Sequence, residues 1–216
     1  RLFNIYRRIG VGRRVVLYLL VGLGNPGLQY SKNRHNVGYL IIDEIQREYG
    51  FPNYKEKFVG HISENKIKEN KVFLLKPQTF MNDSGRSVIE ASSFYKISVD
   101  NIIVIHDEID LAPAKVQLKK GGGFAGHKGL QSIGNHVGKD FYRIRVGVGH
   151  PGEKDLVSGY VLSNFSKDDN QWVSKILKSV SEQIETAILG DENKFNQKMS
   201  DGFNTGVFGV TTKIEK

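Results

Sequence analysis

The feature that most constrains the fold is an uninterrupted apolar run at residues 15–22, VVLYLLVG, which ends at a glycine. A strand with one solvated face alternates between apolar and polar residues, whereas a continuous run predicts a strand that is buried on both faces. Strands of this kind occur almost only in parallel sheets that helices cover on both sides. The run is also far shorter than the roughly 20 residues needed to cross a bilayer. We therefore expect a soluble α/β protein without a membrane partner.

The rest of the chain alternates between strand patterns and helix patterns. Further strands are predicted at residues 59–64, 71–76, 101–106, 114–118 and 142–148. Apolar residues at helical spacing predict helices at residues 37–49, 84–94, 130–137 and 172–187. This alternation predicts a single three-layer α/β domain over residues 15–190, with a mixed, mostly parallel sheet flanked by helices. Residues 191–216 show little periodicity, and we expect them to form an irregular C-terminal extension.

The positive charge of the chain is concentrated in residues 1–14, which we expect to form a basic N-terminal arm. The whole chain has 31 Lys and Arg against 23 Asp and Glu, which gives a net charge of +8. Five of the ten arginines lie in this arm, and no acidic residue precedes Asp43. Such a segment is typical of an organelle transit-peptide remnant, of an arm that binds phosphates, and of a solvated tail. These interpretations stay open, and with them a mitochondrial or otherwise a cytoplasmic location.

Polar residues follow several of the predicted buried strands. Asn25 and His35 follow the first strand, and Asn82 and Asp107 follow two later ones. Because ligands bind beyond the carboxyl ends of the strands in such sheets, we expect these side chains to converge at one edge. A histidine beside a carboxylate can deprotonate water, and side-chain amides can stabilise an oxyanion. The chain has no cysteine and therefore no thiolate nucleophile, so the set favours hydrolysis of an activated ester by water.

A glycine-rich pattern at residues 22–27, GLGNPG, matches the dinucleotide-binding pattern G-x-G-x-x-G. That site needs a helix that starts inside the loop and an acidic residue at the end of the next strand. Here Pro26 and the polar stretch up to Asn36 delay the helix, and Asp43 falls inside it. We therefore expect no cofactor, and no metal site is predicted.

Six motifs follow one another between about Leu17 and about Leu189. They are VGLGNPG from residue 21, RHNVG from residue 34, KPQTFMNDSG from residue 76, HDEID from residue 106, the glycine cluster of residues 121–127 and RIRVGVGHPG from residue 143. Together they resemble the bacterial-type peptidyl-tRNA hydrolases, far more specifically than any one motif alone. The resemblance implies an enzyme that cleaves the ester between a peptide and the 3′ ribose of tRNA, and so recycles tRNA.

The resemblance also implies roles for individual residues. By it, His35 is the catalytic base, Asp107 is its partner, and Asn25 positions substrate and water. Asn82 shares that positioning role, while Met81 and Tyr30 line the groove for the peptide and the terminal adenosine. The positions that match the family's binding site for the tRNA acceptor end are Lys119, Arg145 and Lys154.

Two further expectations concern the basic residues and the lid. Alternation along the strand at residues 142–148 predicts that Arg143 and Arg145 lie together on its polar face. A phosphate clamp formed by Lys119, Arg145 and Lys154 would give sequence-independent affinity that weakens with salt. By resemblance, residues 155–165 correspond to the family's mobile lid.

The chain departs from the family pattern at Lys128. The family has Gly-His-Asn-Gly at the end of its glycine-rich loop, whereas this chain has Gly-His-Lys-Gly at residues 126–129. Lys128 replaces an amide in the substrate-binding site and adds a cation near His35, which disfavours a protonated imidazole. Two hypotheses follow. The first is an active peptidyl-tRNA hydrolase; the second is a hydrolase-like RNA-binding protein without turnover, such as a component of a mitochondrial ribosome. The second predicts contacts of residues 1–14 and 191–216 with ribosomal RNA and ribosomal proteins.

Overall fold

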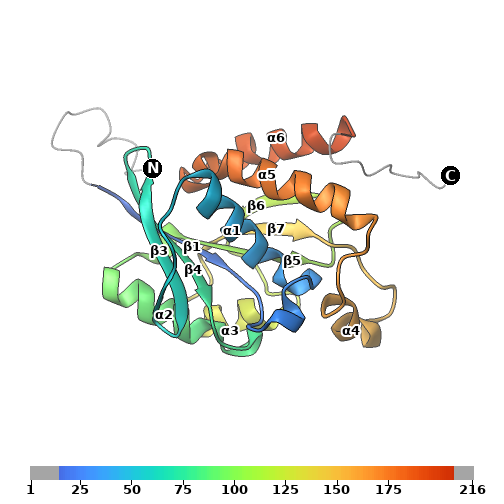
Figure 1. The fold of residues 1–216 in the computed structure, drawn as a ribbon, viewed down its shortest axis with the longest axis horizontal. Helices are drawn as coiled ribbons and strands as arrows, with labels where there is room; N and C mark the ends of the chain where they lie inside the picture. Colours follow the sequence, from blue (N-terminus) through green and yellow to red (C-terminus); the bar gives the residue numbers. More distant parts are fainter. Residues whose placement is uncertain (1–14, 207–216) are drawn as a thin grey trace.

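Strand β1 (Leu17–Gly22) lies at the centre of a seven-stranded sheet with the order β2-β3-β4-β1-β5-β7-β6, in a computed structural model that describes residues 15–206 (Figure 1). The remaining strands are β2 (Lys55–Lys57), β3 (Gly60–Ile67), β4 (Asn70–Pro77), β5 (Ile102–Glu108), β6 (Val116–Lys120) and β7 (Tyr142–Gly147). Strands β4, β1, β5 and β7 run parallel to one another. Strands β2, β3 and β6 are antiparallel to their neighbours. The prediction of a mixed, mostly parallel sheet is confirmed.

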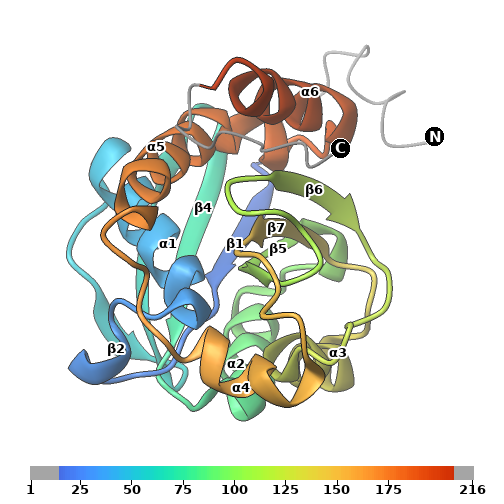
Figure 2. The same ribbon diagram turned by 90° about the vertical axis from the view of Figure 1, so that its right-hand side faces the viewer.

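Helices cover both faces of this sheet, which gives three layers (Figures 1 and 2). The helices are α1 (Val37–Glu48), α2 (Ser84–Tyr95), α3 (Lys128–Val137), α4 (Val157–Val161), α5 (Asp169–Ile188) and α6 (Glu192–Asn204). Residues of α1, α5 and α6 pack with one face of the sheet, and residues of α2 and α3 pack with the other. Within residues 15–206, no helix combines the length and the apolar character needed to span a membrane.

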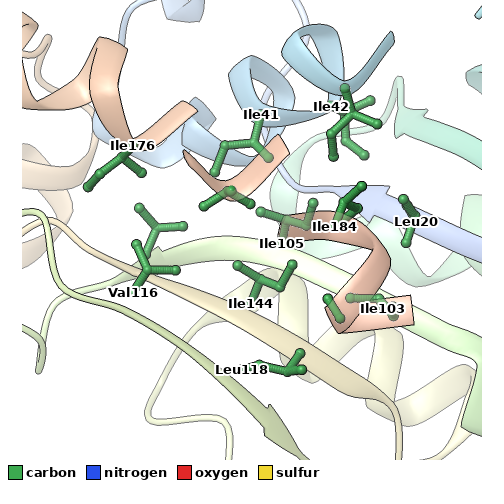
Figure 3. Close-up of a cluster of buried hydrophobic side chains, with 14 of the residues drawn as sticks. Leu20, Ile41, Ile42, Ile103, Ile105, Val116, Leu118, Ile144, Ile176 and Ile184 are labelled. Carbon is green, nitrogen blue, oxygen red and sulfur yellow. The ribbon is translucent and has the colours of Figure 1, made fainter. Parts of the chain in front are cut away.

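The apolar run in β1 serves both layers, as its sequence predicts. Leu20 belongs to the cluster with Ile41 of α1 and Ile184 of α5 (Figure 3). Leu19 and Val21 belong to the cluster on the opposite face. All of these side chains are fully buried. Because successive strand residues point to opposite faces, a strand between two helical layers has no position for a polar residue.

The expectation of an irregular extension from residue 191 is wrong for residues 192–204, which form α6. Phe195 and Met199 lie four residues apart on one face and are buried, and Asp191 accepts a hydrogen bond from the backbone N–H of Lys194. Only two of the 13 residues of α6 are buried and apolar, so its apolar stripe is too narrow to be recognised as helical periodicity in the sequence. The helix forms because that stripe packs against α5 and β6. The domain therefore extends beyond residue 190, whereas residues 1–14 and 207–216 lie outside the described part of the chain.

Candidate active site

His35 lies in a short 3₁₀ turn, Arg34–Asn36, that leads directly into α1. Its Nδ1 is 2.8 Å from Oδ1 of Asp107, near the carboxyl end of β5. Gly38 permits this approach, because a Cβ there would lie 2.4 Å from the backbone oxygen of Ile105. The first turn of α1 therefore rests directly on the strand that carries Asp107. The predicted pairing of His35 with Asp107 is present in the structure.

A second histidine, which the sequence did not single out, contacts the same carboxylate oxygen. Nε2 of His127 lies 3.1 Å from Oδ1 of Asp107. Nδ1 of the same ring accepts hydrogen bonds from the backbone N–H groups of Gly129 and Leu130, at 3.1 and 3.3 Å. A nitrogen that accepts from two amides carries no proton, so the proton of neutral His127 is on Nε2 and is donated to Asp107. The Nδ1 contacts follow from the N-cap position of His127 ahead of α3, and no local pattern in the sequence indicated the contact with Asp107.

The pKa values of the pair follow from burial and charge. Burial alone would raise the pKa of Asp107, but the imidazoles of His35 and His127 lower it well below its usual range. Burial lowers the pKa of His35, whereas the charge and hydrogen bond of Asp107 raise it, and the net effect is an increase above 6.5. Asp107 is therefore an ionised acceptor, and Nδ1 of His35 donates to it. The lone pair of neutral His35 is consequently on Nε2.

His35, Asp107 and His127 also have the residue types of a metal site, since their ligand atoms lie within 4.8 Å of one another. A neutral histidine that binds a metal through Nε2 must carry its proton on Nδ1. Nδ1 of His127 instead accepts from the amides of Gly129 and Leu130. The cluster therefore fits two imidazoles that donate to one carboxylate, and it does not fit a metal ion.

The carboxamide of Asn25 is held in one orientation. Its Oδ1 accepts the backbone N–H of Met81 at 2.8 Å. Its own backbone is fixed by Asn36, whose side chain accepts from Asn25 N at 3.0 Å and donates to Asn25 O at 2.9 Å. Within residues 15–206, Nδ2 of Asn25 has no hydrogen-bond partner. The amide thus offers a fixed donor, as stabilisation of an oxyanion requires.

The residues expected to bind the peptide and the adenosine differ in exposure. Met81 is only 5% exposed, and its sulfur lies under Gly129, where a Cβ would approach it to 2.5 Å. Its link to Asn25 is through its backbone. Asn82, in the turn Met81–Asp83, is exposed, and Tyr30, in the turn Leu28–Tyr30, is half-buried. Neither side chain forms a hydrogen bond within the described residues, so their contact with a substrate stays a prediction.

Two of the predicted phosphate-binding residues, Lys119 and Arg145, line one cavity of about 70 Å³ together with Glu108. The cavity lies beside the glycine cluster of residues 121–127, called the glycine loop below. Lys119 is exposed on β6. Arg145 Nε donates to Glu108 at 3.0 Å, and Nη1 donates to Gln117 at 3.1 Å. Lys154 is exposed in the turn Lys154–Leu156 and does not line this cavity.

Arg143 shares a strand face with Arg145, as strand alternation predicts, but Arg143 is not open to solvent, since it is only 3% exposed. Its guanidinium donates to the backbone oxygens of Gly122 and Gly123. The glycine loop folds over this part of β7, which strand alternation cannot indicate, so Arg143 holds the loop.

Lys128 is the first residue of α3, and its side chain is exposed. It forms no hydrogen bond or ion pair with any residue in the range 15–206. Burial and Asp107, not Lys128, set the pKa of His35.

Comparison with known proteins identifies the family of this chain. The sequence profile of the family described as peptidyl-tRNA hydrolase matches residues 19–205. Peptidyl-tRNA hydrolase of Beijerinckia indica is 49% identical over 189 residues, which are 88% of this chain and 96% of the relative. That of Bradyrhizobium diazoefficiens is 49% identical over 181 residues, which are 84% of this chain and 90% of the relative.

A solved structure has a similar fold. The crystal structure of peptidyl-tRNA hydrolase from Acinetobacter baumannii matches with a TM-score of 0.81 and 36% identity, over 87% of this chain and 97% of that one. The profile match includes α6 and ends at residue 205. From profile, relatives and fold together, this chain belongs to the peptidyl-tRNA hydrolase family.

Proposed function

We propose that this chain hydrolyses the ester between the peptide and the 3′ ribose of tRNA in peptidyl-tRNA, using water activated by His35. The observation that carries the proposal is the hydrogen bond from His35 Nδ1 to the buried carboxylate of Asp107. Family membership supplies the substrate. The pair of His35 and Asp107 supplies a chemistry that fits this substrate, since hydrolysis of an activated ester needs a base that deprotonates water and no covalent nucleophile.

In the proposed reaction, Nε2 of His35 takes a proton from water while the water oxygen bonds to the ester carbonyl carbon. The negative charge of Asp107 stabilises the imidazolium that forms. The intermediate then collapses, the bond from carbon to the ribose oxygen breaks, and that oxygen takes the proton from Nε2. The products are the peptide with a free carboxyl group and tRNA with a free ribose hydroxyl, so all atoms are accounted for.

The amide of Asn25 has the properties of an oxyanion donor in this scheme. Its oxygen is occupied by Met81 N–H, which leaves Nδ2 to donate to the charge that develops on the carbonyl oxygen. His127 supports Asp107 from the other side by donating to the same oxygen. We assign His127 as a positioning residue, because it acts through Asp107 and does not reach the reacting atoms in this scheme.

The proposal also includes the tRNA contacts. Lys119 and Arg145 would hold a phosphate of the acceptor end, with Lys154 as a further cation. Tyr30, Asn82, Met81 and Lys128 would contact the peptide or the terminal adenosine. Phosphate contacts of this kind fix orientation without reading sequence. The exposure of Lys119 and Lys128 supports their part in such contacts.

The hypothesis of an RNA-binding protein without turnover draws no support from the comparisons. It rested partly on an irregular C-terminal extension, but residues 192–204 form a helix inside the family match. A mitochondrial location and contacts with ribosomal RNA or ribosomal proteins are kept as proposals that rest on the arginine-rich residues 1–14. The named relatives are bacterial proteins. Import of a fluorescent fusion into mitochondria, lost when residues 1–14 are deleted, would test the location.

Turnover of N-acetyl-aminoacyl-tRNA by the native chain, compared with His35→Ala, tests the function. Loss of the base should reduce kcat by about 10²–10⁴-fold. His61→Ala is the matched control, because His61 is a partly exposed histidine on β3 that contacts Tyr54 and Glu56 and not Asp107. Equal release by the native chain and His35→Ala would overturn the proposal.

A further inference from the structure

Arg34, the residue before His35, directs its whole side chain toward one distant segment of the chain. Nη1 donates to Ser163 Oγ at 2.7 Å and to the backbone oxygen of Asn164 at 2.8 Å. Nη2 donates to the carboxylate of Asp169 at 2.9 Å. The guanidinium carbon also lies 4.5 Å from the centre of the Tyr160 ring. These contacts join the turn that carries His35 to residues 160–169.

The backbones of the two segments are joined as well. Arg34 N donates to Ser163 O at 3.0 Å, and Phe165 N donates to Lys32 O at 3.1 Å. Asn33 forms an isolated antiparallel bridge with Asn164. The turn is therefore fixed before His35 by residues 163–165, whereas after His35 it continues into α1.

Tyr160 carries the connection on to the strand of Asp107. Its hydroxyl donates to the backbone oxygen of Val148 at 2.5 Å. The N–H of Val148 donates to the backbone oxygen of Glu108 at 3.1 Å, and Glu108 follows Asp107 directly. Contacts therefore run from Arg34 through Tyr160 to the strand end, and the hydrogen bond between His35 and Asp107 closes them into a ring.

Apolar packing alone does not explain how α4 is held. It has five residues, of which only Val161 is buried. Helices this short are not stable by themselves, so tertiary contacts must fix their position. At the far end, Asp169 also accepts from Ser166 N and Trp172 Nε1, which anchors the contact to the start of α5.

We propose that Arg34 is a positioning residue which, together with Tyr160, holds the imidazole of His35 against Asp107 by tying its turn to residues 160–169. The kinetic part of this inference rests on the proposed function. Its physical basis is that a planar guanidinium can bind a hydroxyl, a carbonyl and a carboxylate at fixed angles while it stacks on an aromatic ring. A lysine keeps the charge but cannot keep that geometry.

The test compares Arg34→Lys with the native chain and with Arg47→Lys, a matched change at an exposed arginine of α1. Misplacement of a catalytic group by about 1 Å can cost on the order of 10²-fold in rate, so we expect kcat to fall about 10–100-fold while KM changes little. The groups that face His35 are Asp107 and His127, and the pKa of His35 is raised by Asp107. Because a displaced ring loses that interaction, its pKa, followed by NMR of the imidazole, should fall toward 6.5.

Tyr160→Phe is the second variant, since it keeps the ring beside Arg34 and removes only the hydrogen bond from the hydroxyl to Val148. Tyr54→Phe is its control, because the Tyr54 hydroxyl donates to Asp43 instead. Tyr160→Phe should lower kcat and the pKa of His35 by smaller amounts than Arg34→Lys does. An unchanged pKa of His35 in both variants, whatever their stability, would overturn the inference. The NMR titration needs no turnover, so it is independent of the proposed function, whose own failure would appear as native activity equal to that of His35→Ala.

Discussion

The side-chain amide of Asn196 in α6 pairs with the backbone of Leu118 in the edge strand β6. Leu118 N–H donates to Asn196 Oδ1 at 2.6 Å, and Asn196 Nδ2 donates to Leu118 O at 3.0 Å. The amide therefore takes the place that a further strand would have. An edge strand with free backbone groups is a template for pairing with another chain, and α6 blocks this one.

Replacement of Asn196 by alanine should therefore weaken the fold and open the edge. We expect a loss of about 1–3 kcal/mol in the free energy of unfolding, because buried backbone groups lose their partners. Urea unfolding measures this loss, and size-exclusion chromatography at increasing concentration measures self-association. Asn204→Ala in the same helix is the control, since its side chain is exposed and has only a 3.4 Å contact with Ser200. Equal stability of the two variants would contradict the prediction.

The pH dependence of hydrolysis should follow the pKa of His35, which Asp107 holds above 6.5. A general base works only when deprotonated, so kcat/KM should rise with pH through that pKa and level off above it. Asp107→Asn removes the charge but leaves the burial. The pKa of His35 should then fall below 6.5 and move the rise to lower pH, while kcat drops by about 10²–10⁴-fold. A rise that stays at the native pH in Asp107→Asn would show that this carboxylate does not act on His35.

Substitution of His127 by asparagine separates its two contacts. Asparagine is a good N-cap and can still accept from the amides of α3, but it is too short to reach Asp107. With one donor fewer, the carboxylate attracts the proton of His35 more strongly, so the pKa of His35 should rise further. The pH–rate profile should shift to higher pH with little change in thermal stability. An unshifted profile with a lowered Tm would instead indicate that His127 only caps the helix.

Substitution of Lys119 by alanine should weaken binding of tRNA without a change in kcat. Each phosphate contact that is lost reduces the slope of log affinity against log salt by about 1. Filter binding of tRNA at several salt concentrations measures this slope. Lys175→Ala, at an exposed position on α5, is the control. Arg145→Ala should reduce the slope too, but it also leaves the buried Glu108 unpaired and should lower stability. A slope equal to that of the native chain in Lys119→Ala would rule out the phosphate contact.

Much of the fold and part of the site could be predicted because the signals are local. The apolar run of β1 must lie between two layers, and the polar residues after the strands must lie at the same sheet edge. His35, Asp107 and Asn25 were found in this way, since each follows a strand or the loop after it. The motifs then identified the family, which the profile match confirms.

The sequence by itself determined a buried central strand, helices on both faces and a histidine and a carboxylate at one edge. The tertiary structure decided that His127 reaches Asp107 from 20 residues away, that the glycine loop covers Arg143, and that Arg34 holds residues 160–169. It also decided that the faint apolar stripe of α6 packs as a helix. The physical reason is that periodicity reports which side of an element is apolar. Which loop or helix covers that side depends on contacts between segments far apart in the chain.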